Sequence, residues 1–231
     1  KTPMYTVLWV VILVLLPALF VGWEYNNFLI KEWYGIINPM NSEYTLETKT
    51  GIYNLSAFIY AYLTEMPDDR ISGSRNIMSI SYELAGTITN VVRVLLVLLT
   101  LHFTKWTPFK RLTDWKQLFW EFGYISFAFP LIFPAQNKYS FYYIFPVLFY
   151  LSIYLYYTKE EKGSFWKTKK SILIPIIIYF VLTNLTSSNI IGKALYDQTQ
   201  FYKVMTFGIV ALLIAYIQVK PSMLDSKSTE D

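Results

Sequence analysis

Long apolar stretches separated by short polar segments dominate the hydrophobic pattern of this chain. A helix needs about 20 mostly apolar residues to cross the hydrocarbon core of a bilayer. Six stretches approach that length, and charges are rare within them. They cover residues 4–22, 77–103, 115–133, 139–157, 171–185 and 201–219. The pattern therefore predicts an all-α, polytopic integral membrane protein with about six transmembrane helices.

Residues 23–76, between the first two stretches, show a weaker helical pattern. Apolar residues recur at helical spacing within 28–37 and again within 55–63. Pro39 and Pro67 follow these segments, and a proline disfavours helix in the residue before it. We expect two short amphipathic helices that lie along the membrane interface.

Composition supports the membrane class and excludes several kinds of site. The 231 residues are 54% hydrophobic and 16% charged, whereas soluble domains carry about a quarter of charged residues. There is no cysteine and only one histidine, His102, so neither a thiolate nor a histidine-cluster metal site can form. Glycine-rich nucleotide-binding loops are also absent. We expect no metal and no cofactor.

Basic residues in two short loops predict the orientation. Lys105, Lys110 and Arg111 follow the second stretch, and Lys159 and Lys162 follow the fourth. The positive-inside rule makes both loops cytoplasmic, and this explains the net charge of +4 without nucleic-acid binding.

Six crossings then place both ends of the chain inside. We expect a single transmembrane domain over 1–231, with an extracytoplasmic loop at 23–76 and a polar cytoplasmic tail at 220–231. The chain opens on Lys1, and we expect it to be the C-terminal part of a longer polypeptide. Frequent isoleucine, lysine and tyrosine without cysteine suggest a bacterial inner (plasma) membrane.

The second predicted span contains polar and charged residues, which are costly within a membrane and therefore need an explanation. Glu83, Thr87, Asn90 and Arg93 fall within a stripe of roughly 120° on a helix. Such a stripe should face protein or water. It could be an interhelical polar contact that fixes packing, or one wall of a functional cavity.

Lys138 lies in a very short polar gap between two apolar stretches, on the predicted outer side. It could anchor its helix among lipid headgroups, or it could face inward and pair with a lipid-borne phosphate. Arg70 and Arg75 in the outer loop could likewise be solvated or bind phosphate. Position alone does not decide between these interpretations.

The order of segments resembles a known family. Four segments carry the resemblance, namely LLPALFVGWEY, FLIKEWYGIINP, YNLSAFIYAYL and FPAQNKYSFYYIFPVLFYL. Together they resemble the C-terminal half of glycosyltransferase family 87. Members of this family are polytopic GT-C enzymes that use polyprenyl-phosphate sugars. The residues that match the short elements of the family are Asn54, Ser56, Pro134, Lys138, Tyr142, Tyr143 and Pro146. Phe133 departs from the serine that the family often has, and the usual glutamine after the asparagine is absent.

The resemblance implies that a sugar, such as a mannose-type hexose, is transferred from a polyprenyl-phosphate donor to a lipid or glycan acceptor on the outer face. Lys138, helped by Arg70 or Arg75, would bind the donor phosphate. The lipid or sugar slot would be lined by Tyr142, Tyr143, Asn54 and Ser56, although an interfacial aromatic belt also explains the two tyrosines. Enzymes of this type carry the catalytic aspartate in their first extracytoplasmic loop, so we expect the base to lie outside these residues.

Two other functions fit the same pattern. The chain could be a non-catalytic membrane subunit or scaffold whose aromatic surfaces bind partner membrane chains. It could also be a transporter of a lipid-linked substrate, but transporters are often built from inverted repeats, and no repeat is evident here.

Overall fold

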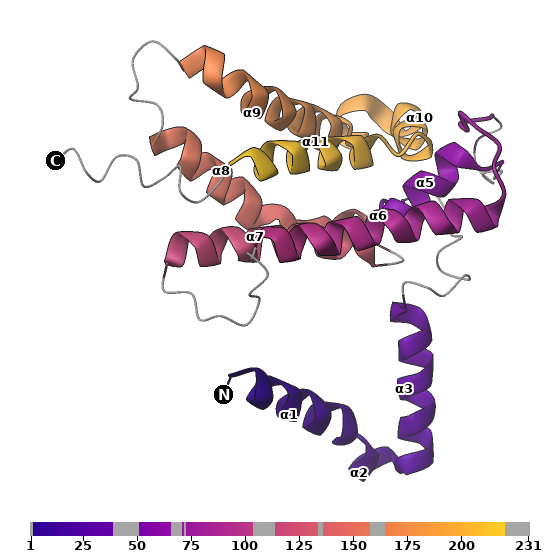
Figure 1. The fold of residues 1–231 in the computed structure, drawn as a ribbon. Helices are drawn as coiled ribbons and strands as arrows, with labels where there is room; N and C mark the ends of the chain where they lie inside the picture. Colours follow the sequence, from indigo (N-terminus) through magenta and orange to yellow (C-terminus); the bar gives the residue numbers. More distant parts are fainter. Residues whose placement is uncertain are drawn as a thin grey trace.

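The structure is a computed structural model that describes residues 2–38, 51–65, 71, 73–103, 114–133, 136–157 and 165–219. Helices make up most of this part of the chain, which contains no strand and a single antiparallel bridge between Ile52 and Asn137 (Figure 1). The prediction of an all-α fold is confirmed.

The helices follow one another with short breaks. In chain order they are α1 (Thr2–Leu15), α2 (Ala18–Val21), α3 (Trp23–Ile37), α5 (Leu55–Leu63), α6 (Tyr82–Phe103), α7 (Trp115–Ile132), the 3₁₀ helix η1 (Lys138–Ile144), α8 (Phe145–Tyr157), α9 (Phe165–Phe180), the π-helix η3 (Val181–Leu185), α10 (Ser188–Phe201) and α11 (Val204–Gln218).

In the described part of the chain a bundle is formed by five long helices, namely α6, α7, α8, α9 and α11. Helix α7 packs against α6 and against α8, and α9 packs against α11. Helices α6 and α8 end, and α7 and α9 begin, at one end of the bundle, while α5 and α10 lie at the other end (Figure 1). Helices α1, α2 and α3 stand apart from the bundle. The helices of the bundle therefore alternate in direction along the chain, in the order α6, α7, α8, α9 and α11 (Figure 1).

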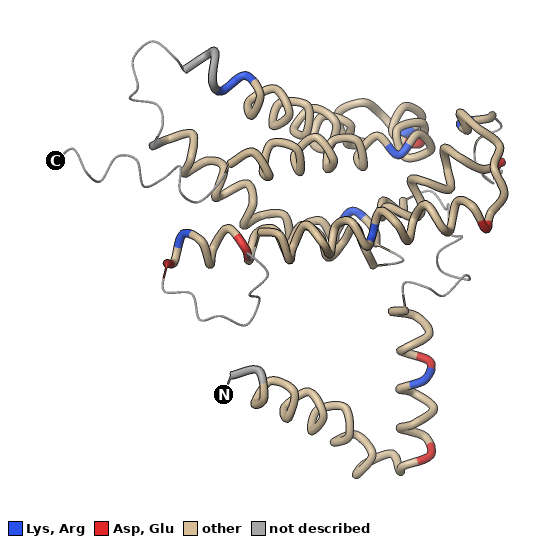
Figure 2. The backbone as a smooth tube through the Cα atoms, viewed as in Figure 1, with Lys and Arg blue, Asp and Glu red and all other residues tan. Residues whose placement is uncertain are grey.

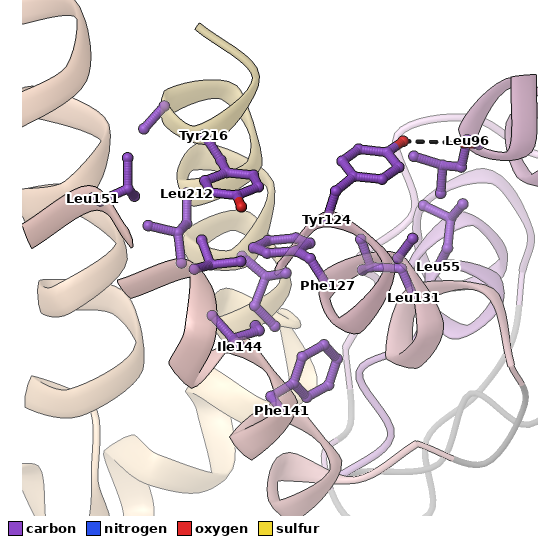
Figure 3. Close-up of a cluster of buried hydrophobic side chains, with 14 of the residues drawn as sticks. Leu55, Leu96, Tyr124, Phe127, Leu131, Phe141, Ile144, Leu151, Leu212 and Tyr216 are labelled. Carbon is purple, nitrogen blue, oxygen red and sulfur yellow. Dashed lines mark hydrogen bonds between the residues drawn. The ribbon is translucent and has the colours of Figure 1, made fainter. Parts of the chain in front are cut away.

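The core gathers around α7, which buries an aromatic face. Trp120, Tyr124 and Phe127 are buried there, and the Trp120 ring stacks on that of Tyr216 from α11 with 5.2 Å between centroids. The buried hydroxyls are satisfied by backbone carbonyls: Tyr124 donates to Leu96 at 3.0 Å (Figure 3), and Tyr216 donates to Trp120 at 2.7 Å. The centre of the bundle thus joins helices through both stacking and hydrogen bonds.

Within the described residues, three helical stretches are long and apolar enough to cross a membrane, namely Met4–Val21, Tyr82–Phe103 and Lys138–Tyr156. A fourth is possible if α9 and α10, which bend by 92° at their junction, form one broken span. The predicted number of six is not confirmed among the described residues, since α7 begins with several polar residues and α11 has only 15 residues. What the structure supports is an all-helical chain with apolar helices of membrane-spanning length.

Both helices predicted within 23–76 exist, as α3 and α5, but α5 differs from its expected setting. Ala57, Tyr60 and Ala61 are buried, and α5 packs against α6 and α7. A short helix that is apolar on most of its faces is stable only when other helices cover it. Helix α5 is therefore part of the protein core, whereas α3 stays largely exposed.

Charged side chains are distributed unevenly along the bundle. Figure 2 shows long uncharged stretches in the helices of the bundle, interrupted in the middle of α6 by the buried Arg93. This is the distribution expected when the middle of the bundle faces hydrocarbon, since a charge there is costly.

Candidate functional site

A short extended segment before α5 connects three parts of the fold. The side chain of Asn54 accepts a hydrogen bond from the Ala57 backbone at 2.7 Å, which caps α5, and donates to the Phe133 carbonyl at 3.3 Å. The Tyr53 backbone N–H donates to the Gln136 carbonyl at 2.9 Å. These bonds place the start of α5 beside the residues that lead into η1.

A cavity of about 480 Å³ opens beside this segment, at the end of the bundle that carries α5 and α10. One wall is the beginning of η1 and the other is the bend from η3 into α10. Its lining consists of Tyr53, Lys138, Tyr139, Phe141, Tyr142, Tyr179, Thr183, Asn184, Thr186, Ser187, Ser188, Asn189, Tyr196, Thr199 and Met205. Hydroxyl, amide and aromatic groups dominate this lining, and among the described residues Lys138 is its one charged side chain.

Lys138 is held at the mouth of the cavity by the cap of η1. The side chain of Asn137 accepts a hydrogen bond from the Tyr139 backbone at 2.9 Å, which fixes the first turn. The Lys138 Nζ lies 5.2 Å from the Tyr139 ring centroid and 5.8 Å from that of Tyr196. Cations within about 6 Å of an aromatic ring are attracted to it. The ammonium group is therefore oriented by two rings while it remains exposed.

The opposite wall depends on an unusual helix end. Helix α9 widens into the π-helix η3, and the chain then turns into α10. Gly208 of α11 lets η3 approach closely, because a Cβ there would lie 3.1 Å from the Thr183 Cγ2 and 3.2 Å from the Leu182 Cβ. π-helical turns are rare and occur frequently at functional sites.

The structure brings some of the predicted donor-site residues together and separates others. Lys138 and Tyr142 both line the cavity. Tyr143 does not line it. Its ring is exposed, and the ring centroid lies 6.1 Å from that of Phe129. Arg75 is buried elsewhere, as described next, and Arg70 lies outside the described residues.

Arg75 joins the segment after α5 to the end of α10. Its Nη1 donates to the Phe201 carbonyl at 2.8 Å, and its guanidinium carbon lies 4.6 Å from the centre of the Phe201 ring. Tyr62 of α5 makes a parallel bond, with its hydroxyl 2.7 Å from the Tyr202 carbonyl. In this structure Arg75 is a packing residue and does not reach the cavity lining.

Asn54 and Ser56 also have structural roles. Asn54 caps α5, and the Ser56 hydroxyl accepts a hydrogen bond from Arg93 Nη2 at 2.5 Å. Both side chains are buried, and neither is part of the cavity lining. Their match to the family pattern therefore coincides with positions that hold α5 in place.

The polar stripe predicted on α6 divides between two surfaces. Arg93 is buried, and its Nη1 also donates to Asn90 Oδ1 at 3.1 Å. Glu83 and Thr87 are exposed, because the buried face of α6 follows Ala85, Thr89, Arg93 and Leu96. The stripe meets that face only at Arg93, so the packing interpretation fits Arg93 better than the cavity interpretation.

Lys203 is a notable residue that the sequence interpretation did not single out. It lies between α10 and α11 in a left-handed conformation (φ 49°) and is fully buried. Its Nζ donates to the Ile52 carbonyl at 3.0 Å, and Thr206 donates to the Tyr53 carbonyl at 3.1 Å. A lysine at the start of an apolar stretch was the available signal, because such a charge needs a partner.

Tyr53 adds a neutral polar group to the cavity. Burial, and secondarily the nearby Tyr196, raises the pKa of Tyr53 above its ordinary value. Its hydroxyl therefore stays protonated throughout the physiological pH range and can donate a hydrogen bond. In the described part of the chain no group of three His, Cys, Asp or Glu side chains is placed to hold a metal ion.

Comparison of the chain with protein-family models, curated proteins and solved structures found no match.

Proposed function

We propose that this chain forms the donor-binding part of a membrane glycosyltransferase, which transfers a hexose from a polyprenyl-phosphate carrier to a lipid or glycan acceptor on the extracytoplasmic face. The observation that supports this best is the position of Lys138, an exposed cation at the mouth of a cavity lined by hydroxyl, amide and aromatic groups. The family resemblance of the sequence points to the same reaction.

The surroundings of Lys138 suit a substrate with three chemically different parts. Phosphate is matched by the ammonium group and sugar hydroxyls by the polar lining. The lipid tail is matched by apolar side chains beside the mouth, where Tyr142 is 76% exposed and Phe145 is 70% exposed. Tyrosine and phenylalanine at this level are typical of residues that meet lipid.

The mechanism assigns Lys138 an electrostatic role. When the bond between the sugar and the phosphate breaks, the leaving phosphate gathers negative charge. A cation already oriented by the Tyr139 and Tyr196 rings stabilises that charge without reorganising, and this lowers the barrier. We assign the role of the base that deprotonates the acceptor to none of the described residues.

We further propose the complete topology of six crossings, with both ends of the chain on the cytoplasmic side of a bacterial inner membrane. The alternating directions of α6, α7, α8, α9 and α11 support it (Figure 1). Both basic loops would then lie on one side, and the cavity would lie on the other.

A transfer assay on the full-length protein tests the proposed function. Purified protein in lipid nanodiscs is supplied with polyprenyl-phosphate-[³H]mannose and a membrane extract as the acceptor source. Lys138→Ala should lower the transfer rate about 10- to 100-fold, the range expected for one lost charge-assisted hydrogen bond.

Lys193→Ala is the matched control. Lys193 is an exposed lysine on α10 that does not line the cavity, so its removal should leave the rate unchanged. Equal rates for Lys138→Ala and the wild type would contradict the role of Lys138. If the wild-type protein neither bound nor used the donor, a non-catalytic subunit would be the better interpretation.

A further inference from the structure

We propose that the wall formed by η3 and the start of α10 recognises the sugar of the lipid-linked donor, with Asn184 as a specificity-determining residue. This inference rests on the proposed function and deepens it. It assigns the phosphate to Lys138 and the sugar ring to the residues across the cavity.

The two walls differ in charge. The bend contributes Thr183, Asn184, Thr186, Ser187, Ser188 and Asn189 to the lining, all of them neutral side chains with hydroxyl or amide groups. Such groups form hydrogen bonds with hydroxyl groups but offer no net charge to a phosphate. The cation stands on the other wall, in η1. A phosphorylated sugar is therefore bound best with its phosphate toward Lys138 and its ring toward the bend.

Hydrogen bonds within the bend prepare its acceptors. The hydroxyl of Thr183 donates to the Tyr179 carbonyl at 2.7 Å, and that of Thr186 donates to the Leu182 carbonyl at 2.8 Å. Each hydroxyl proton is thus used within the helix, and the oxygen remains able to accept from a ligand. These threonines are fixed by η3, and their positions do not depend on a ligand.

Asn184 is the residue best placed to discriminate among sugars. Its amide nitrogen lies 3.0 Å from Thr183 Oγ1, which orients the side chain, and the residue is exposed at the cavity wall. An oriented amide carbonyl accepts a hydrogen bond only from a hydroxyl in one position on the sugar ring. A site built to bond a hydroxyl rejects an analogue that lacks it.

Aromatic rings and size agree with this assignment. Tyr196 from α10 and Tyr139 from η1 also line the cavity and approach Lys138. They supply flat apolar surfaces for the C–H face of a sugar ring. The cavity of about 480 Å³ also falls within the range of about 300 to 1,000 Å³ that is typical of small-molecule sites.

The test compares two lipids on the same protein. Full-length protein in nanodiscs is titrated with decaprenyl phosphate and with decaprenyl-phosphate-mannose, and bound lipid is measured by native mass spectrometry. The wild type should bind the mannose form more tightly. Asn184→Ala should reduce this preference about 2- to 10-fold, the equivalent of one hydrogen bond, and leave the affinity for decaprenyl phosphate unchanged.

Three further variants make the result specific. Lys138→Ala should weaken binding of both lipids, because both carry a phosphate, and should weaken that of decaprenyl phosphate at least as much, because its monoester carries the larger negative charge. Gln198→Ala removes an exposed amide of α10 outside the cavity lining and should change neither affinity. If Asn184→Ala does not fold, Ser188→Ala, at an exposed lining position, should show the same loss of preference.

The outcomes separate the two proposals. Failure of the wild type to bind either lipid would overturn the proposed function. Binding of both lipids, with the same preference for mannose in the wild type, Asn184→Ala and Ser188→Ala, would overturn only the sugar-recognition wall. In that case Lys138 would still bind the phosphate.

Discussion

At the scale of single residues, Gly123 of α7 lies against a buried tyrosine of α11. Gly123 faces the buried Tyr216, and a Cβ at position 123 would come close to the Tyr216 hydroxyl and 3.2 Å from its ring. The hydroxyl cannot simply move away, because it donates to the Trp120 carbonyl. The absence of a side chain at residue 123 is thus required for the contact between these helices.

Gly123→Ala should therefore destabilise the protein by about 1–3 kcal/mol, the usual cost of overpacking a core. Thermal unfolding in detergent, followed by near-UV circular dichroism, measures the effect. Gly73→Ala is the control, because nothing lies within 4 Å of the Cβ that it adds. A midpoint for Gly123→Ala equal to that of Gly73→Ala would show that the two helices separate at no cost.

The contact between Arg93 and Ser56 predicts a coupled pair. Removal of the serine hydroxyl leaves a buried guanidinium with one acceptor fewer, so Ser56→Ala should cost about 1–3 kcal/mol. In an Arg93→Leu background the same change should cost much less. A double-mutant cycle of unfolding midpoints gives the coupling.

The same pair decides between packing and cavity interpretations of Arg93. If Arg93 only joins α5 to α6, Arg93→Leu should retain sugar transfer once its stability is taken into account. A cycle without coupling, or a folded Arg93→Leu protein that has lost transfer, would count against the packing interpretation.

The sequence led us to expect Lys138, Tyr142 and Tyr143 at one binding site, and the cavity lining includes the first two but not Tyr143. The sequence did not predict that Arg75 would donate a hydrogen bond to the Phe201 carbonyl, or that the Ser56 hydroxyl would accept one from Arg93. Those contacts join residues more than 35 positions apart, and a single sequence carries no signal for such pairs. Short motifs identify residues that matter without separating binding from packing.

At the scale of elements, Asn54 shows how a helix cap can position a site. Its side chain starts α5 and also reaches the carbonyl of Phe133, at the end of α7. Asn54→Ala should cost about 0.5–2 kcal/mol for the lost cap. Asn54→Ser, which keeps a capping oxygen, should recover part of that loss in the same thermal unfolding assay. An unfolding midpoint for Asn54→Ala at the wild-type value would mean that packing alone holds α5.

Periodicity predicted the helices well but not how they bend or what covers them. The stretch 171–185 ends as expected at Leu185, yet the widening into η3 has no signature in hydrophobic spacing. Helix α10 was missed because Gly192 (φ 77°) interrupts its pattern. The setting of α5 was missed because a short apolar segment looks the same whether lipid or protein covers it.

At the scale of the whole molecule, the absence of cysteine makes the topology directly testable. A single cysteine introduced as Lys193→Cys should react with a membrane-impermeant maleimide in intact cells. Lys116→Cys, near the start of α7, should react only after the membrane is permeabilised. Equal labelling of both positions in intact cells would contradict the proposed orientation and would place the cavity on the wrong side for the reaction.

Composition was sufficient to predict an all-helical, apolar chain, because a backbone surrounded by lipid must satisfy its hydrogen bonds internally and a helix does so within one segment. The number of crossings does not follow from composition, since α7 packs through buried aromatic residues and its mean hydropathy is lowered by Lys116, Gln117 and Glu121, so that it is not among the helices apolar enough to span. One face of α7 is covered by protein, while Leu118, Phe122 and Ile125 on its other face are exposed.

Helix α1 presents the opposite case, and its isolation has a mechanical consequence. None of the apolar stretch Met4–Val21 is buried within the described protein. Its 18 residues rise about 27 Å, slightly less than a hydrocarbon core of about 30 Å. The bundle leaves this stretch uncovered, while Asn26 of α3 donates a hydrogen bond to its Val14 carbonyl at 3.3 Å, so its tilt would follow hydrophobic mismatch together with that of α3. A thinner or thicker bilayer would therefore move α1 and α3 while the bundle around the cavity kept its shape.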